Sequence, residues 1–140
     1  MTRLSIDTYT PGDPAYPAAL TACLGPDAPE CVAAAGPLPL LHARTIAVFC
    51  SRACPGSAIL HAYDLMMKLR HRDVSVISGY HSPMEKECMR ALSHGSAGIV
   101  WCLPKALEAF RLPGEFDDLF SAQRLLIVSP FRPTVRRITK

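Results

Sequence analysis

From residue 45 onward, short apolar runs alternate with helical patterns of hydrophobic residues. The runs cover residues 45–50, 74–78, 98–103 and 124–129, and each is too short to form a helix. Between the first two runs, over residues 59–69, apolar side chains recur at helical spacing. This alternation is typical of βαβ units with a parallel sheet. The pattern therefore predicts an α/β fold with a mainly parallel sheet.

The first apolar run fixes the expected order of the strands. Residues 45–50 are apolar almost throughout, as is usual for a strand that is covered on both faces. We therefore expect this strand at the centre of the sheet, between the second and third runs, with the fourth run beyond the third. Such an order predicts a doubly wound, Rossmann-like domain with helices on both faces, which binds ligands at the carboxyl ends of its strands.

Residues 1–44 have a different composition, because prolines recur throughout them. These are Pro11, Pro14, Pro17, Pro26, Pro29, Pro37 and Pro39. Proline limits each candidate element here to a turn or two, and one short helix near Pro17 is expected. We predict two parts: an irregular, proline-rich lead-in over residues 1–44, packed on a Rossmann-like domain over residues 45–140.

The last third of the chain has weaker signals. A helix is expected from Pro104 through Phe110, ending before Pro113-Gly114, and a short helical stretch over residues 116–122. The basic residues after the fourth strand carry no signal for a further element.

The strongest local signal follows the second strand. Ser82-Pro83-Met84-Glu85 fits a capping box, with serine at the N-cap, proline at the first helical position and Glu85 reaching back to the Ser82 amide. We expect the helix to end at Gly95. This gives Glu85 a structural role, and the same carboxylate is the one weak candidate for a general acid or base.

Length and composition exclude several classes of protein. The chain has 140 residues, 49% of them hydrophobic and 19% charged, which indicates one globular domain. No apolar run approaches the roughly 18 residues of a membrane span, and the N-terminus lacks the apolar core of a signal peptide. We therefore expect a cytoplasmic protein without a membrane partner. A net charge of +3 permits an anionic partner without requiring one.

The six cysteines do not indicate a metal site. They include no Cys-x-x-Cys pair and no histidine at zinc-finger spacing, and two of them, Cys50 and Cys102, lie in predicted strands. No metal and no cofactor are predicted.

Polar side chains gather where the first two strands end. Arg52 follows the first strand, and the helix that begins at Ser82 follows the second. A guanidinium, a serine hydroxyl and the free amides of a helix N-terminus together favour phosphate. His81 and Tyr80 are candidates for contacts with a phosphate or a base. The predicted phosphate- or ligand-binding residues are Ser51, Arg52, Ser78, Gly79, Tyr80, His81 and Ser82.

These motifs resemble those of the DNA-processing protein A family (DprA, or Smf), one of the Rossmann-like SLOG domains. The similarity rests on the run 46–52, the run 78–88, Trp101-Cys102-Leu103-Pro104 and the run 126–131. It is closest to a short bacterial subgroup of the family. In DprA, the loops after the first two strands bind the phosphates of single-stranded DNA. By position, Ser51 and Arg52 match the first loop, and Ser78 and Gly79 match the second.

The resemblance implies a protein that binds single-stranded nucleic acid or a nucleotide, in DNA processing, uptake or recombination. It also implies that the sequence stops before the last helix and strand of the family. An exposed sheet edge at that place favours a homodimer.

Two other functions stay open. Some SLOG proteins are phosphoribohydrolases that cleave N-glycosidic bonds with a Pro-Gly-Gly-x-Gly-Thr-x-x-Glu motif. That motif is absent, so Glu85 or Glu87 would have to act in its place. The other alternative is a sensor that binds a nucleotide without turnover.

Overall fold

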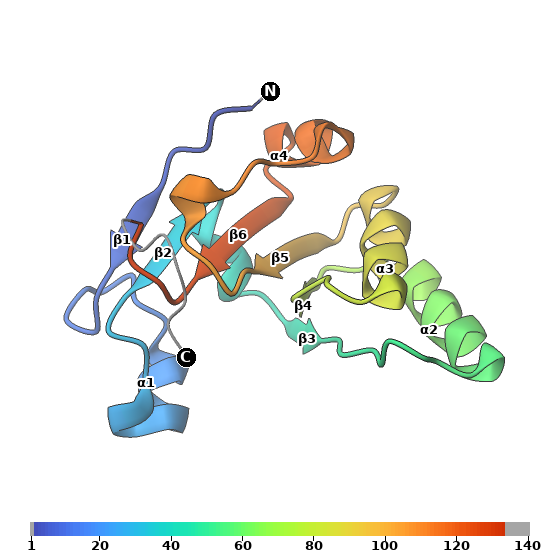
Figure 1. Ribbon diagram of the computed structural model, residues 1–140, viewed down its shortest axis with the longest axis horizontal. Helices are drawn as coiled ribbons and strands as arrows, with labels where there is room; N and C mark the ends of the chain where they lie inside the picture. The colour runs from blue at the N-terminus through green and yellow to red at the C-terminus, as the bar shows by residue number, and fades with distance from the viewer. Residues whose placement is uncertain (1, 134–140) are drawn as a thin grey trace.

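Four parallel strands form one side of a six-stranded sheet in the computed structural model, which describes residues 2–133 (Figure 1). They are β3 (Thr45–Ala47), β4 (Ser75–Ser78), β5 (Gly98–Cys102) and β6 (Leu125–Ser129). Each pairs in parallel with the next along the chain. The predicted Rossmann-like α/β fold and its four strands are confirmed.

The predicted strand order is wrong, because β3 lies at the edge of the sheet and not at its centre. Thr45 and Ala47 are exposed, and the side chain of Phe49, just beyond the strand, is 86% exposed. An apolar run shows that a strand is hydrophobic. It does not show whether another element covers that strand. Within residues 2–133, no strand pairs with the outer edge of β3.

The helices that connect the parallel strands pack on a single face of the sheet. These are α2 (Gly56–Leu69), α3 (Pro83–Ser93) and α4 (Asp117–Ser121). Strands that follow in chain order with right-handed crossovers place every connection on the same side. Met66 of α2 and Leu92 of α3 are accordingly buried in one hydrophobic cluster. None of the helices in the described residues is long and apolar enough to cross a membrane.

The proline-rich segment supplies two further strands, so it is not the irregular lead-in that we expected. β1 (Asp7–Tyr9) pairs with β2 (Val32–Ala35), and β2 pairs with β6, both antiparallel. Between them lie α1 (Ala18–Leu24), which begins directly after Pro17, and a 3-10 turn over Gly25–Asp27. Pro17 precedes α1 and Pro26 lies in the first turn of the 3-10 segment, so the prolines do not interrupt these elements.

β2 has mostly small side chains, and both of its faces are buried. Ala33 and Ala35 belong to the cluster beneath α2 and α3. Val32 and Ala34 belong to a second cluster on the opposite face, which α1 and the 3-10 turn Leu38–Leu41 help to cover. Helices therefore lie on both faces of the sheet, as predicted.

Gly36 makes the turn at the end of β2 possible. Its φ is +112°, and a Cβ at this position would collide with the carbonyl oxygen of Leu125 on β6. No other residue type satisfies both conditions without strain.

The connection from β5 to β6 contains no helix over residues 104–110, contrary to the prediction. Two 3-10 turns, Leu107–Ala109 and Gly114–Phe116, take its place, and the short helix predicted next is present as α4. Phe110 and Phe116 pack edge-to-face on Trp101, with ring centroids 5.2 and 5.9 Å away. Packing around the indole thus overrides local helix propensity. The last part of the predicted basic tail, residues 134–140, lies outside the described residues.

Candidate functional site

The first turn of α3 has the predicted capping box. The Ser82 hydroxyl accepts a hydrogen bond from the Glu85 amide (3.3 Å), and the Glu85 carboxylate accepts one from the Ser82 amide (3.2 Å). Pro83 is the first helical residue and has no N–H to satisfy. Both halves of the box are therefore formed as the sequence indicated.

Glu85 does more than cap the helix, because its carboxylate also joins two strand ends. Oε2 accepts a hydrogen bond from the amide of His81 (2.8 Å) in the loop after β4, and Oε1 accepts one from the amide of Cys50 (3.0 Å), beyond β3. The side chain is buried. A protein carboxylate thus already holds the position at this helix N-terminus where a bound anion was expected.

These hydrogen bonds keep Glu85 ionised. Burial alone would raise the pKa of this carboxyl, but the amides of Cys50, His81 and Ser82 outweigh burial, and the pKa is lowered. Both oxygens of the carboxylate are engaged by backbone N–H groups. Such a group serves as a fixed structural anion, and this arrangement does not favour proton transfer to a substrate.

Ser51 and Arg52 line a pocket of about 340 Å³ together with the start of α3. Both residues are exposed. Pro83, Met84 and Glu87 form its α3 side. From the sequence we expected Arg52 and the first turn of α3 to share one crevice, and both of them line this pocket.

The turn after β4 is rigid and mostly buried. Ser78 Oγ accepts a hydrogen bond from the amide of Tyr80 (3.2 Å), whose φ is +46°. The Tyr80 hydroxyl donates to the carbonyl of Val76 (2.8 Å), and burial raises the pKa of this phenol. Tyr80 also packs edge-to-face on Trp101. Its ring is therefore a core side chain with no open face for a base to stack on.

The other predicted contact residues differ in exposure and in hydrogen bonding. His81 is exposed, and only its backbone takes part in the hydrogen bonds around Glu85. Ser78 and Ser82 are buried and committed to the local turns. Gly79 accepts a hydrogen bond from the Trp101 indole N–H through its carbonyl (3.0 Å).

One family model matches nearly the whole chain. It is the model of the family described as DNA recombination-mediator protein A, and it matches residues 7–136. The chain belongs to this family. The resemblance to DprA in the sequence is thereby confirmed. No curated protein matches the chain.

Two solved DprA structures share the fold of this DNA recombination-mediator protein A family member. DprA from Streptococcus pneumoniae aligns with a TM-score of 0.72 and 21% identity over 95% of this chain. DprA from Helicobacter pylori, which is described as having a unique single-stranded DNA binding mode, aligns with a TM-score of 0.68 and 17% identity over 96% of this chain. The chain spans 46% and 60% of those two proteins, respectively.

Three cysteine thiols of this family member are not activated. Burial raises the pKa of Cys50 and of Cys88, that of Cys88 to about 12. Burial also raises the pKa of Cys102 to about 11. Thiols with raised pKa values are poor nucleophiles. Within residues 2–133, no group of three or more His, Cys, Asp or Glu side chains is placed to hold a metal ion.

Sequence reasoning missed two features of the family member's site. One is the bond from Cys50 to Glu85, which joins residues 35 positions apart. The other is a pocket between the N-terminus and the connection after β5, which Arg3 and Arg111 both line. Nothing in the sequence placed these two arginines at one pocket, because they lie far apart in the chain and in irregular segments.

Proposed function

We propose that this protein binds single-stranded nucleic acid through its phosphates, at the carboxyl ends of β3 and β4. One observation carries the proposal: the guanidinium of Arg52 and the first turn of α3 line the same pocket. Membership of the DNA recombination-mediator protein A family supports it. The single-stranded DNA binding described for the Helicobacter pylori relative points to the same class of ligand.

Side chains supply most of the binding groups in this proposal. Glu85 occupies the amides of Ser82 and His81, and Ser82 Oγ holds the amide of Glu85. Within the described part of the chain, this leaves the Met84 amide as the first-turn donor without a partner. Arg52 is therefore the main phosphate ligand, with Ser51 beside it and His81 within the adjoining loop.

Arg52→Ala tests the proposal directly. The affinity for a fluorescently labelled single-stranded oligonucleotide, measured by anisotropy at several salt concentrations, should fall roughly tenfold because a charge-assisted contact is lost. The slope of log K against log salt should become shallower by about one unit. Unchanged affinity and slope would show that nucleic acid does not bind here.

The matched control is Arg44→Ala. Arg44 is an exposed arginine at the opposite end of β3, so this change removes the same charge away from the pocket. It should leave both the affinity and the salt slope as they are in the wild type. An equal loss in the two variants would indicate a general effect of net charge.

The glycosidase alternative gains no support from the geometry. Both oxygens of Glu85 face backbone amides, and Glu87 is exposed and paired with Arg90 on the surface of α3. Glu85, whose pKa is lowered, therefore lacks the environment of a proton donor.

A further inference from the structure

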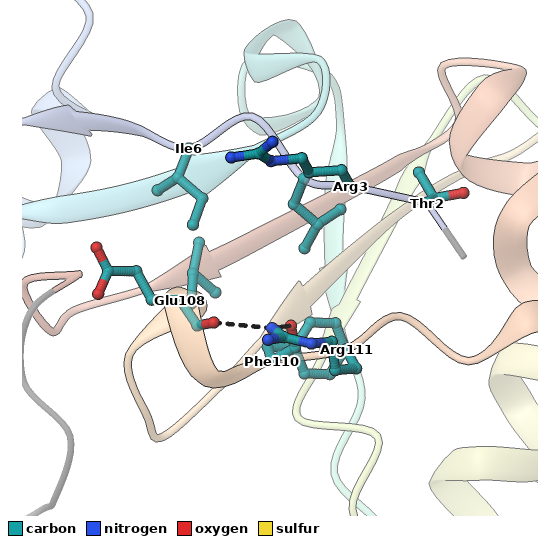
Figure 2. A pocket seen from close by; sticks show the side chains of 8 residues that line it. Thr2, Arg3, Ile6, Glu108, Phe110 and Arg111 are labelled. Atoms are coloured by element: carbon teal, nitrogen blue, oxygen red, sulfur yellow. Dashed lines mark hydrogen bonds between the residues drawn. The ribbon is translucent and has the colours of Figure 1, made fainter.

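A second pocket, of about 490 Å³, lies between the N-terminal segment and the connection after β5 (Figure 2). Residues 2–6 form one wall, and residues 107–111 form the other. Leu4, Ile6 and Leu107 give it an apolar lining. It shares no lining residue with the pocket at Arg52.

Two arginines line this pocket, one on each wall. Figure 2 shows Arg3 on the N-terminal segment and Arg111 on the facing segment. Nη1 of Arg111 donates to the carbonyl oxygens of Glu108 (2.9 Å) and Phe110 (3.0 Å), which fixes the direction of its side chain. The remaining N–H groups of a guanidinium held in this way are available to a ligand.

Neither arginine is neutralised by a carboxylate of the described chain. The only ion pairs among residues 2–133 are those of Arg90 with Glu87 and Glu115. Glu108 lines the same pocket without pairing to either arginine. A further cation is close, because Lys105 Nζ lies 5.6 Å from the centre of the Phe110 ring. Such an excess of positive charge favours an anionic ligand.

We infer that this pocket binds the terminal phosphate monoester of a nucleotide. A terminal phosphate carries nearly two negative charges at neutral pH, which match two guanidinium groups better than the single charge of an internal phosphodiester. The apolar lining suits the sugar and base, and the Glu108 carboxylate is an acceptor for base N–H groups. The ligand is either a free mononucleotide or the 5′-phosphorylated end of a strand, and in the second case the inference rests on the proposed function.

Four ligands separate these sources: thymidine, deoxythymidine 5′-monophosphate, and one oligothymidylate with either a 5′-phosphate or a 5′-hydroxyl. Calorimetric titration of the wild-type protein should show roughly tenfold tighter binding of the 5′-phosphorylated strand, the gain expected for one charge-assisted contact. The monophosphate should bind more tightly than thymidine by a similar factor. A gain with the strand alone indicates a strand end, and a gain with the monophosphate alone indicates a free nucleotide. No gain in either comparison overturns the inference.

Variants assign any such gain to the pocket. Arg3→Ala should abolish the advantage of the 5′-phosphate, since it removes one of the two guanidinium groups. Arg111→Gln should do the same. If Arg111→Gln lowers the Tm through its lost carbonyl contacts, Arg3→Ala decides, because no hydrogen bond or ion pair within residues 2–133 involves the Arg3 side chain. An advantage that survives Arg3→Ala would place the phosphate elsewhere.

Arg52→Ala distinguishes this inference from the proposed function. It should weaken both oligonucleotides equally and leave the advantage of the 5′-phosphate intact. If Arg52→Ala has no effect while Arg3→Ala removes the advantage, the proposed function fails and the second pocket stands. The reverse result rejects the second pocket alone.

Discussion

Glu85 is the residue on which the geometry of the candidate site depends. Its carboxylate links the end of β3, the loop after β4 and the start of α3 through the amides of Cys50, His81 and Ser82. An anion that neutralises a helix N-terminus and closes a gap between strands performs the role that a bound phosphate performs in other proteins. The site therefore assembles without a ligand.

Glu85→Gln tests this role. The uncharged amide loses the charge assistance of three hydrogen bonds in a buried position, so the free energy of unfolding should fall by about 2 kcal/mol. Urea unfolding at pH 7 measures the change. Glu87→Gln, on the exposed side of the same helix, is the control and should cost well under 1 kcal/mol.

The difference in stability between wild type and Glu85→Gln should also depend on pH. The folded-state pKa of Glu85 is lowered, so its contribution is present above the unfolded pKa of about 4.3 and is lost as the pH falls through the lower folded value. The stability difference between wild type and Glu85→Gln should be full above about pH 5 and shrink below about pH 4. A difference that stays constant down to pH 3 would contradict the lowered pKa.

Tyr80→Phe tests whether the Tyr80 hydroxyl has a structural role or binds a ligand. The change removes the hydrogen bond to the Val76 carbonyl, and stability should fall by about 1 kcal/mol. Oligonucleotide affinity should stay at the wild-type value, since the ring is buried against Trp101. A marked loss of affinity with little loss of stability would show that the Tyr80 hydroxyl contacts the ligand.

At the scale of residues, the sequence predicted local chemistry better than long-range contacts. The capping box was readable because Ser82 and Glu85 are three positions apart. The burial of Tyr80 was not, because it depends on Trp101, which lies on the neighbouring strand. Whether Ser51, Arg52 and His81 bind a ligand stays a prediction.

Helix α3 is fixed at its end as firmly as at its beginning. The guanidinium of Arg124, at the start of β6, donates to the carbonyls of Leu92, Ser93 and Ala97 at distances of 2.8–3.2 Å. A cation at this end also complements the helix dipole. Burial lowers the pKa of Arg124, but the group stays charged at neutral pH.

Arg124→Lys should loosen this helix end. An ammonium keeps the charge but cannot reach three carbonyls at once, so stability should fall by roughly 1–2 kcal/mol. Hydrogen exchange followed by mass spectrometry should accelerate in the last turn of α3 and over residues 95–97. Arg90→Lys, in an exposed ion pair on the same helix, should leave exchange unchanged.

At the scale of elements, hydrophobic periodicity predicted the regular helices. It missed the elements that depend on tertiary packing. The helices after β3 and β4 were predicted, because apolar residues mark them at helical spacing. β1 and β2 were missed, since three or four residues among prolines give no period to detect. The helix predicted over residues 104–110 does not form, because Phe110 packs on the Trp101 indole instead.

At the scale of the whole molecule, the sheet has an exposed edge at β3 within residues 2–133. Thr45 and Ala47 expose the strand, and Phe49 is 86% exposed beyond it. On α2, Leu60 is 65% exposed, whereas Met66 of the same helix is buried. An unpaired strand edge beside exposed apolar side chains favours pairing with another chain.

Self-association through this edge should therefore depend on concentration. Light scattering coupled to size-exclusion chromatography should show a growing dimer fraction between micromolar and hundreds of micromolar protein, reduced in Phe49→Ser. Leu24→Ser is the control, because Leu24 is 45% exposed on α1, which connects β1 and β2 at the other end of the sheet from β3. A monomer over the whole range would reject the homodimer expected from the sequence.

At this scale, the fold class could be read from the sequence but the strand order could not. A run such as residues 45–50 has the same composition at a centre or at an edge, and only its neighbours decide between them. The homodimer and the division at residue 44 stay predictions.

The single tryptophan of the chain provides a reporter that is already in place. The indole of Trp101 donates to the Gly79 carbonyl and touches Tyr80, so its emission senses the loop that leads into α3. Intrinsic fluorescence can follow a titration without any dye or label. Excitation at the red edge of its absorbance separates the indole signal from that of the four tyrosines.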